Sequence, residues 1–261
     1  GLCRALIVRG HTVRVLTTSA GPFSADIDGV PVEALRRCPP ARFFHAPTIR
    51  FALKKALRGS DVVHVHGLYT HPAWLAARLA HAHGIPSVLS PHGMLMRAAI
   101  GGRSHWIKSA WIRLIERVRF RRATAVHFSS ALEEREYTAL RMPARPSFVV
   151  PHGVDSTASR MANSGRTILF LGRLCWIKGL DRLLDALALL PEVQLVLAGP
   201  DEDGYAARLR AQALRLGISD RIRWAGYVDG AEKQRLLDEA ALLVLPSYSE
   251  NFGMVVLEAW A

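Results

Sequence analysis

Short apolar runs alternate with amphipathic stretches along this chain of 261 residues. Eight runs with apolar centres are five to seven residues long, the usual length of a strand. Several are apolar throughout, which is typical of parallel strands that are buried on both faces. The runs predict strands over residues 12–18, 61–67, 86–91, 124–130, 167–172, 193–199, 222–226 and 241–247.

The segments between these runs show helical periodicity. After the run at 167–172, Leu180, Leu183, Leu184 and Leu187 recur on one face of a helix, and charged residues occupy the opposite face. Strands that alternate with helices in this way predict an α/β fold built on doubly wound parallel sheets. In such sheets ligands bind at the carboxyl ends of the strands, so the residues after each strand are the candidates for chemistry.

The alternation is interrupted once, at residues 151–166. This segment is rich in Ser, Gly and Asn and poor in apolar residues, which is typical of a linker between domains. We therefore expect two α/β domains, 1–155 and 156–261.

Both ends of the sequence resemble helices. Residues 1–9 read as the end of a helix that Gly10 stops, and residues 254–261 are apolar apart from Glu258. A helix that is apolar all round is expected to be buried. We therefore expect a fragment that lacks residues at both ends.

Charge is distributed unevenly between the two predicted domains. Residues 1–156 carry 22 Lys and Arg against 9 Asp and Glu, whereas residues 157–261 carry 12 against 13. The basic half is suited to an acidic ligand, a polyanion or an anionic membrane face. Nucleic acid is disfavoured because no recognition module is present.

Composition excludes several other classes of protein. Half of the residues are hydrophobic and 21% are charged, which excludes a disordered chain. No apolar stretch approaches the roughly 20 residues of a membrane-spanning helix. The three cysteines, Cys3, Cys38 and Cys175, are far apart in the sequence, which argues against a disulfide framework and fits a reducing, cytoplasmic compartment.

Two cations follow the predicted strand at 167–172. The segment reads GRLCWIKGL, with Gly172, Arg173 and Lys178 where the strand gives way to a helix. A diphosphate needs several positive partners, and the helix N-terminus adds main-chain amides and partial positive charge. The segment is not a P-loop, and the chain contains no G-x-G-x-x-G motif.

A second candidate follows the strand at 241–247. Glu250 precedes the apolar segment that contains Glu258, and a lone carboxylate there needs a partner such as a pair of ribose hydroxyls. The helix entrance between them offers main-chain amides that suit phosphate. The residues of this entrance are Asn251, Phe252, Gly253 and Met254.

Together these motifs resemble the retaining glycosyltransferases of family 4, which have the two-domain GT-B fold. The resemblance is carried by G-R-L-x-x-x-K-G and, about seventy residues later, by E-N-F-G-x-x-x-x-E. The segments at 149–155, 197–204 and 226–237 agree with it, although His152 replaces the family's usual Asn. The resemblance covers essentially the whole chain. It implies two Rossmann-like domains that face a cleft. It also implies that the first domain lacks its initial strand and glycine-rich loop, and that the second is incomplete at its end.

The resemblance implies a role for each matching residue. Arg173 and Lys178 would bind the diphosphate of a nucleotide-sugar donor, and Glu258 would hold the ribose hydroxyls. Glu250 would lie by the donor sugar, and the amides near 252–254 would assist at the phosphate or sugar. Tyr227 and Val228 would lie against the base.

Three histidines follow strands of the first predicted domain. His64 and His66 lie on one face of a strand end, and His92 follows the next strand. The family resemblance implies that His92 faces the donor sugar. For His64 and His66 the favoured interpretation is simple packing, and a second is that His66 lines the cleft. A metal-binding H-x-H pair is a third alternative, but it requires further ligands at later strand ends, which the sequence does not offer.

Residues 97–122 carry eight basic residues and one acid, with aromatic residues interleaved. Ile107, Trp111, Leu114 and Val118 follow helical spacing, and such a basic amphipathic helix suits an anionic membrane surface. The alternative is a core-facing helix with a solvated basic rim. We expect peripheral association with the inner membrane face and a lipid-linked or saccharide acceptor.

The sequence thus predicts a metal-independent glycosyltransferase that uses a nucleotide-sugar donor, retains the anomeric configuration and serves polysaccharide or glycolipid synthesis. No cofactor or metal is expected, because Arg173, Lys178 and a helix N-terminus would stabilise the negative charge of the departing diphosphate in place of a metal ion. Two alternatives remain open. One is a Rossmann-type NAD-dependent oxidoreductase or epimerase, and the other is a non-catalytic basic module that binds membrane surfaces.

Overall fold

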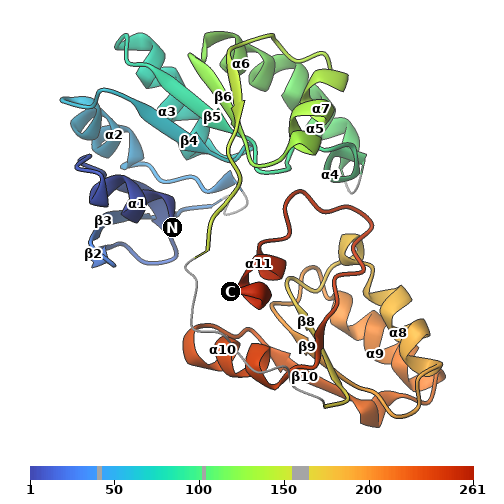
Figure 1. The fold of residues 1–261 in the computed structure, drawn as a ribbon. Coiled ribbons are helices and arrows are strands. Elements are labelled where there is room, and N and C mark those ends of the chain that lie inside the picture. Colours follow the sequence, from blue (N-terminus) through green and yellow to red (C-terminus); the bar gives the residue numbers. More distant parts are fainter. Residues whose placement is uncertain (40–42, 102–103, 155–164) are drawn as a thin grey trace. The chain divides into compact units, whose positions relative to one another are not determined.

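The chain divides into two compact units, Gly1–Gly153 (unit 1) and Val154–Ala261 (unit 2), drawn in Figure 1. This computed structural model describes residues 1–39, 43–101, 104–154 and 165–261. Most of the linker predicted over 151–166 lies outside the described residues. Each unit is therefore considered by itself.

Unit 2 is built on a sheet of four parallel strands in the order β10-β9-β8-β11. All four were predicted from the apolar runs. The strands are β8 (Thr167–Leu171), β9 (Gln194–Ala198), β10 (Ile222–Gly226) and β11 (Leu242–Leu243). The helical elements are η3 (Trp176–Lys178), α8 (Leu180–Ala188), α9 (Tyr205–Arg215), η4 (Ser219–Arg221), α10 (Gly230–Glu239) and α11 (Met254–Trp260).

Alternate residues of β8 and β9 pack into two different apolar clusters. Phe170 and Leu195 belong to a cluster with the four leucines of α8, which are buried as their spacing predicts. Leu169 and Val196 belong to the other cluster, which includes Leu236 of α10. Because neighbouring side chains of a strand point to opposite faces, both faces of this sheet are covered by helices, as a doubly wound fold requires.

Unit 1 contains a second parallel sheet, in the order β4-β5-β6-β7. The first three strands were predicted, and Figure 1 shows them side by side. The elements are β4 (Val63–His66), α3 (His71–Ala82), β5 (Ser87–Ser90), β6 (Ala125–Phe128), α7 (Ala131–Ala139) and β7 (Ser147–Val149). Thr70 caps the N-terminus of α3, and its hydroxyl accepts a hydrogen bond from the Ala73 amide at 3.4 Å.

A smaller mixed sheet precedes it, in the order β1-β3-β2. β1 and β3 are parallel, whereas β2 is antiparallel to β3, so the first unit is not purely parallel. β2 and β3 were not predicted. The elements are α1 (Leu2–Val8), β1 (Val15–Ser19), β2 (Phe23–Ile27), β3 (Val30–Arg36) and α2 (Ile49–Leu57).

The basic segment 97–122 is not one regular helix. It comprises α4 (Arg97–Gly101), α5 (His105–Trp111), the π-helical turn η2 (Ile112–Glu116) and α6 (Arg117–Arg122). Its buried residues are Ile112, Glu116, Arg119 and Phe120. The predicted apolar stripe lies largely in solvent, since Leu114 is 70% exposed and Val118 is 38% exposed. Among the described helices, none combines the length and apolar composition that a bilayer crossing requires.

Candidate active site

In unit 2, the loops that follow β8 and β11 meet at one edge of the sheet. The two strands are parallel, hydrogen-bonded neighbours, so their carboxyl ends lie together. The main-chain N–H of Tyr248, after β11, donates to the carbonyl oxygen of Ile177, after β8, at 2.8 Å. This hydrogen bond holds Lys178 beside the segment that carries Glu250.

An ion pair joins the same two loops. Lys178 Nζ donates to Glu250 Oε2 at 2.6 Å, and the Ser247 hydroxyl donates to that oxygen at 3.1 Å. The side chains of Lys178 and Glu250 are 16% and 35% exposed, so water screens them less than an open surface pair. A cation and a carboxylate that lie 72 positions apart in the sequence are therefore brought to one point.

Glycine makes this close approach possible. Gly179 has a φ of +64°, and a Cβ at this position would overlap the carbonyl oxygen of Pro246 in the loop after β11. A side chain there would therefore be strained twice, by the left-handed backbone and by the overlap. The residue after Lys178 thus sets how closely the two loops pack.

Arg173 forms a more exposed ion pair. Its Nη1 donates to Glu202 Oε2 at 2.6 Å, with side chains that are 58% and 45% exposed. Glu202 follows β9, the neighbour of β8 on its other side. Exposed pairs contribute at most about 1 kcal/mol. An anionic ligand can therefore replace Glu202 as the partner of Arg173 at little cost.

The expectation of a fully buried helix over 254–261 is wrong. None of the residues of α11 is buried, and Trp260 is 81% exposed. Among the described residues the apolar cluster of β8 and β9 covers one side of the helix, where Val255 packs. Glu258 is not left unpaired, because its Oε1 lies 2.7 Å from Nζ of Lys233 on α10.

The other predicted donor-binding residues lie around the same sheet edge. Gly172 directly follows β8, and its N–H donates to the carbonyl oxygen of Ala198 at 2.9 Å. Asn251 and Phe252 are half-buried in the turn before α11, Gly253 caps that helix with a φ of 71°, and Met254 is its first residue.

The two residues assigned to the base differ in exposure. Tyr227 follows β10 and is 69% exposed, so its ring is open to a ligand. Val228 is buried in the apolar cluster with Leu169 and Leu236, so its side chain is occupied by packing and only its main chain could meet a base.

Unit 1 gathers histidines at the ends of three parallel strands. His64 Nε2 lies 2.6 Å from the Ser90 hydroxyl, which lies 2.8 Å from Nδ1 of His127. His127 Nε2 lies 2.9 Å from the carbonyl oxygen of Val150, which accepts from it. β4, β5 and β6 are thus joined by one chain of polar side chains.

His66 and His92 form a second contact, in which Nδ1 of His66 lies 2.8 Å from Nε2 of His92. The His92 ring stacks on His66 and, at a centroid separation of 5.5 Å, on His152. His92 itself has a φ of +52°, so the turn after β5 is tightly defined.

Burial and repulsion between neighbouring rings keep His64 and His66 neutral at pH 7. Burial, followed by the charge of neighbouring histidines, lowers the pKa of His64 to about 3 and that of His66 to about 4. Burial also lowers the pKa of His92, against the opposing effect of Glu133. In the described ranges no group of three or more His, Cys, Asp or Glu side chains is arranged to hold a metal ion.

A buried carboxylate anchors the turn that carries His92. Glu133 on α7 is 1% exposed, and its Oε1 accepts a hydrogen bond from the main-chain N–H of Gly93. Its Oε2 accepts from the amide and hydroxyl of Ser129 at 2.9 and 3.0 Å. Buried carboxylates of this kind are stable only when they are well hydrogen-bonded, so Glu133 fixes the turn to the start of α7.

Both units match known protein families. Residues 1–153 match the glycosyl transferase 4-like domain, and residues 155–261 match the glycosyl transferases group 1 family. The chain belongs to the group 1 glycosyltransferases. This group 1 chain also has the expected GT-B type of α/β fold, with a Rossmann-like parallel sheet in each unit.

Two relatives of this group 1 chain have the names of enzymes that act on sugars. It is 28% identical over 258 residues to the GDP-mannose:cellobiosyl-diphosphopolyprenol alpha-mannosyltransferase of Xanthomonas oryzae pv. oryzae, covering 94% of this chain and 65% of the relative. It is 31% identical to the glycogen synthase of Mycobacterium tuberculosis over an alignment of 303 positions, which covers 100% of this chain and 70% of the relative. The chain spans 54% to 65% of the length of the mannosyltransferases it matches.

Two solved structures have the same fold. Sucrose-phosphate synthase from Thermosynechococcus elongatus aligns with a TM-score of 0.79 and 22% identity, over 99% of this chain and 71% of that one. Anabaena HepE in complex with UDP and glucose aligns with a TM-score of 0.72 and 20% identity, over 95% and 78%.

The partners of the glycosyltransferase motif residues were not predicted. Glu202 and Lys233 lie in segments that resemble the family, at 197–204 and 226–237, yet nothing in their spacing links them to Arg173 and Glu258. Ser247 gave no signal of its own. These pairings depend on which strands are neighbours in the sheet, and that order is a property of the fold.

Proposed function

We propose that this chain carries out glycosyl transfer from a nucleoside-diphosphate sugar to an acceptor hydroxyl, with retention at the anomeric carbon. The family membership, the donor motif residues and the sugar-transferring relatives support this proposal. They favour it over the NAD-dependent oxidoreductase alternative. The mannosyltransferase relatives, named for diphosphopolyprenol acceptors, support a role in polysaccharide or glycolipid synthesis.

The contact between Lys178 and Glu250 carries the proposal. A nucleotide sugar needs a cation at its diphosphate and a hydrogen-bond acceptor at its sugar hydroxyls, within a few ångströms of each other. Lys178 Nζ and Glu250 Oε2 lie 2.6 Å apart at the ligand-binding edge of the sheet. In the donor complex, Lys178 turns to the diphosphate, and Glu250 accepts from a sugar hydroxyl or stabilises positive charge at the anomeric carbon.

The chemical step requires stabilisation of the departing nucleoside diphosphate. The bond between the anomeric carbon and the diphosphate breaks, and its electron pair adds negative charge to the leaving group. Arg173 and Lys178 follow β8 and bind that charge. Gly172 has no side chain, so the main chain can approach the diphosphate closely, and the amides of 252–254 donate hydrogen bonds to the phosphate or sugar. We propose that these groups suffice without a metal ion, which activity in the presence of EDTA would test.

The nucleoside is proposed to lie along the same edge. Glu258 on α11 accepts from the ribose hydroxyls, and its pairing with Lys233 holds the carboxylate in place. Tyr227, after β10, stacks on the base. In unit 1, His92 is assigned to the donor sugar, with its ring oriented by His66.

Replacement of Arg173 by Ala tests this assignment. A charge-assisted hydrogen bond is worth about 1.5–3 kcal/mol, so we expect kcat/KM for the donor to fall about ten- to hundredfold. The assay follows release of nucleoside diphosphate from UDP-, GDP- and ADP-sugars. Arg166→Ala is the matched control, since Arg166 also forms an exposed ion pair, with Glu192, but lies before β8. Equal kinetics in the two variants would contradict the role of Arg173.

We also propose that unit 1 contacts an anionic membrane surface through residues 97–122, where a lipid-linked acceptor would lie. Trp106 and Leu114 are 68% and 70% exposed beside the basic side chains of this segment. Aromatic and apolar groups flanked by Lys and Arg are typical of interfacial segments. Cosedimentation with vesicles containing phosphatidylglycerol at low salt is expected, and a folded chain that stays in the supernatant would contradict it.

A further inference from the structure

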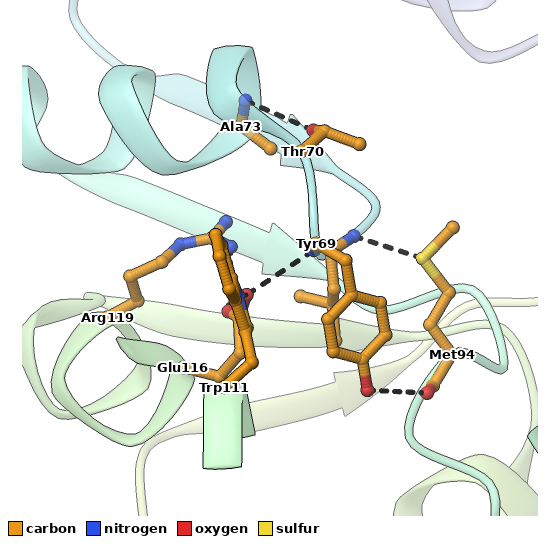
Figure 2. A network of polar contacts seen from close by, with 8 residues as sticks. Tyr69, Thr70, Ala73, Met94, Trp111, Glu116 and Arg119 are labelled. Atoms are coloured by element: carbon orange, nitrogen blue, oxygen red, sulfur yellow. Dashed lines mark hydrogen bonds and ion pairs between the residues drawn. The ribbon is translucent and has the colours of Figure 1, made fainter. Parts of the chain in front are cut away.

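A buried carboxylate lies at the centre of the helical segment 105–122. Glu116 is fully buried, and its Oε1 accepts from Nε1 of Trp111 at 2.8 Å and from the main-chain N–H of Tyr69 at 3.4 Å (Figure 2). Its Oε2 accepts from Nη1 of Arg119 at 2.7 Å. Glu116 thus accepts three hydrogen bonds, out of the about four that the lone pairs of a carboxylate can take, so it is well satisfied.

Arg119 is not satisfied to the same degree. Its side chain is 4% exposed, and Nη1 is bound to Glu116. Nε and Nη2 are buried without a hydrogen-bond partner among the described residues. A buried donor that lacks a partner destabilises the fold, and more so when it is charged. Burial lowers the pKa of Arg119 while Glu116 raises it, and an arginine in such a setting remains a cation.

Arg119 also lines a cavity of about 250 Å³ between α3 and the segment 112–122. Two more arginines line it, the exposed Arg78 on α3 and Arg122 on α6. The remaining lining is apolar, from Trp74, Ala77, Leu114, Ile115 and Val118. Three guanidinium groups at one cavity exceed the single charge of Glu116, so the cavity has an excess of positive charge.

We propose that this cavity binds the phosphate group of an anionic amphiphile. The phosphate oxygens accept hydrogen bonds from the exposed Arg78 and Arg122, whose planar groups match the geometry of an oxyanion. The apolar side chains take the first carbons of the attached chain. Arg119 contributes positive charge from the wall of the cavity, and the ligand balances the excess charge.

The apolar lining selects an amphiphile over free phosphate. Leu114 and Val118 are 70% and 38% exposed at this site, which leaves apolar surface that a free ion would not cover. Covering this surface removes apolar area from water, which favours binding of the amphiphile. The inference deepens the proposed membrane contact and rests on it only for the source of the ligand, because the site itself is independent of vesicle binding and of glycosyl transfer.

The test uses soluble ligands. Dihexanoyl phosphatidic acid, inorganic phosphate and dihexanoyl phosphatidylcholine are titrated separately into the full chain by calorimetry. We expect phosphatidic acid to bind at least about tenfold more tightly than either of the others, because it alone offers both the accessible phosphate and the chain. Equal affinity for inorganic phosphate would overturn the amphiphile and leave a free anion as the source.

Variants decide whether binding occurs at this cavity. Arg78→Gln combined with Arg122→Gln removes two phosphate ligands without touching the buried pair, and we expect a loss of about tenfold or more in affinity. Arg121→Gln combined with Arg135→Gln changes the net charge equally at exposed positions outside the lining, and it is expected to bind as the parent does. Equal losses in the two double variants would overturn the proposal.

A third variant addresses Arg119 itself. Glu116→Gln combined with Arg119→Met avoids an unpaired buried charge, and loss of binding by a chain with a native circular dichroism spectrum is expected. If this variant does not fold, the Arg78 and Arg122 pair decides alone. The variant with Arg78→Gln and Arg122→Gln is expected to bind nucleotide as the parent does. Failure of this proposal and failure of glycosyl transfer are therefore distinguishable.

Discussion

At the scale of single residues, each proposed donor-binding cation or carboxylate already has a partner of opposite charge. Lys178 pairs with Glu250, Arg173 with Glu202, and Lys233 with Glu258. The family motifs singled out one or both residues of each of these ion pairs, but the sequence could not predict which residues pair. We therefore propose that a donor binds by exchanging partners, with the carboxylates competing with its diphosphate for the cations.

This competition predicts an opposite effect of one substitution on binding and on turnover. Glu250→Gln removes the charge that holds Lys178, so we expect a nucleoside diphosphate without a sugar to bind equally or several-fold more tightly. Transfer from the nucleotide sugar is expected to fall, because Glu250 is also proposed to accept a hydrogen bond from a sugar hydroxyl or to stabilise charge at the anomeric carbon. Calorimetry and the donor assay measure the two effects, with Glu192→Gln as the control. A parallel loss of diphosphate affinity would contradict the partner exchange.

The histidines of unit 1 predict that stability depends on pH. An unfolded histidine has a pKa of about 6.5, whereas the folded chain has values of about 3 for His64 and about 4 for His66. Between pH 6.5 and 4 the unfolded state therefore binds more protons, and the folded state loses stability as the pH falls through this window. Thermal unfolding followed by circular dichroism from pH 7 to 4 measures the decline.

Substitution separates this cluster from other histidines. His64→Gln combined with His66→Gln is expected to flatten the decline of Tm below pH 6.5. His83→Gln, at the exposed end of α3, is expected to leave it as in the parent chain. An unchanged slope in the double variant would show that other groups cause the acid sensitivity.

At the scale of secondary-structure elements, the apolar pattern predicted most strands of the two parallel sheets and missed β2, β3 and β7. Every residue of β2 and β7 is exposed, and β7 is only three residues long. β3 has Pro31 and Glu33 between its apolar residues, so none of the three forms a long apolar run. The helical stripe in 97–122 failed for a different reason. The π-helical turn at Ile112–Glu116 breaks the 3.6-residue period, and the buried face there contains Glu116 and Arg119.

The contact between the loops after β8 and β11 predicts a strong effect of one methyl group. Gly179→Ala adds a Cβ that overlaps Pro246 at a left-handed φ of +64°. Gly217→Ala is the matched control, with a φ of +67° and no atom within 4 Å of the added Cβ. We expect the control to lose about 1 kcal/mol of unfolding free energy, and Gly179→Ala to lose about 2–5 kcal/mol.

Denaturant unfolding followed by circular dichroism compares the two glycine variants. Because the overlap displaces the loop that carries Ser247 and Glu250, Gly179→Ala is also expected to weaken nucleotide binding, whereas Gly217→Ala is not. Equal stability of the two variants would mean that the loops do not pack as closely as the structure has them.

At the scale of the whole molecule, the two units differ in charge and in the chemistry they offer. The basic residues are concentrated in unit 1, with its histidines and its arginine-lined cavity, whereas unit 2 is nearly neutral and contains the predicted diphosphate site. Strand periodicity predicted the α/β class, and the family motifs supplied the candidate donor residues, whose roles stay a prediction. The buried Glu116 and Glu133 could not be predicted, since nothing near them in sequence distinguishes them from solvated charges.

The most direct test of the account is nucleotide binding by the 261-residue chain. UDP, GDP and ADP are titrated by calorimetry in the presence of EDTA, with Glu258→Ala as the test variant and Glu192→Ala as its control. We predict that one nucleotide binds selectively, that Glu258→Ala weakens its binding about tenfold or more, and that Glu192→Ala leaves it unchanged. A folded chain that binds none of the three, or binds equally with and without Glu258, would contradict the assigned donor site.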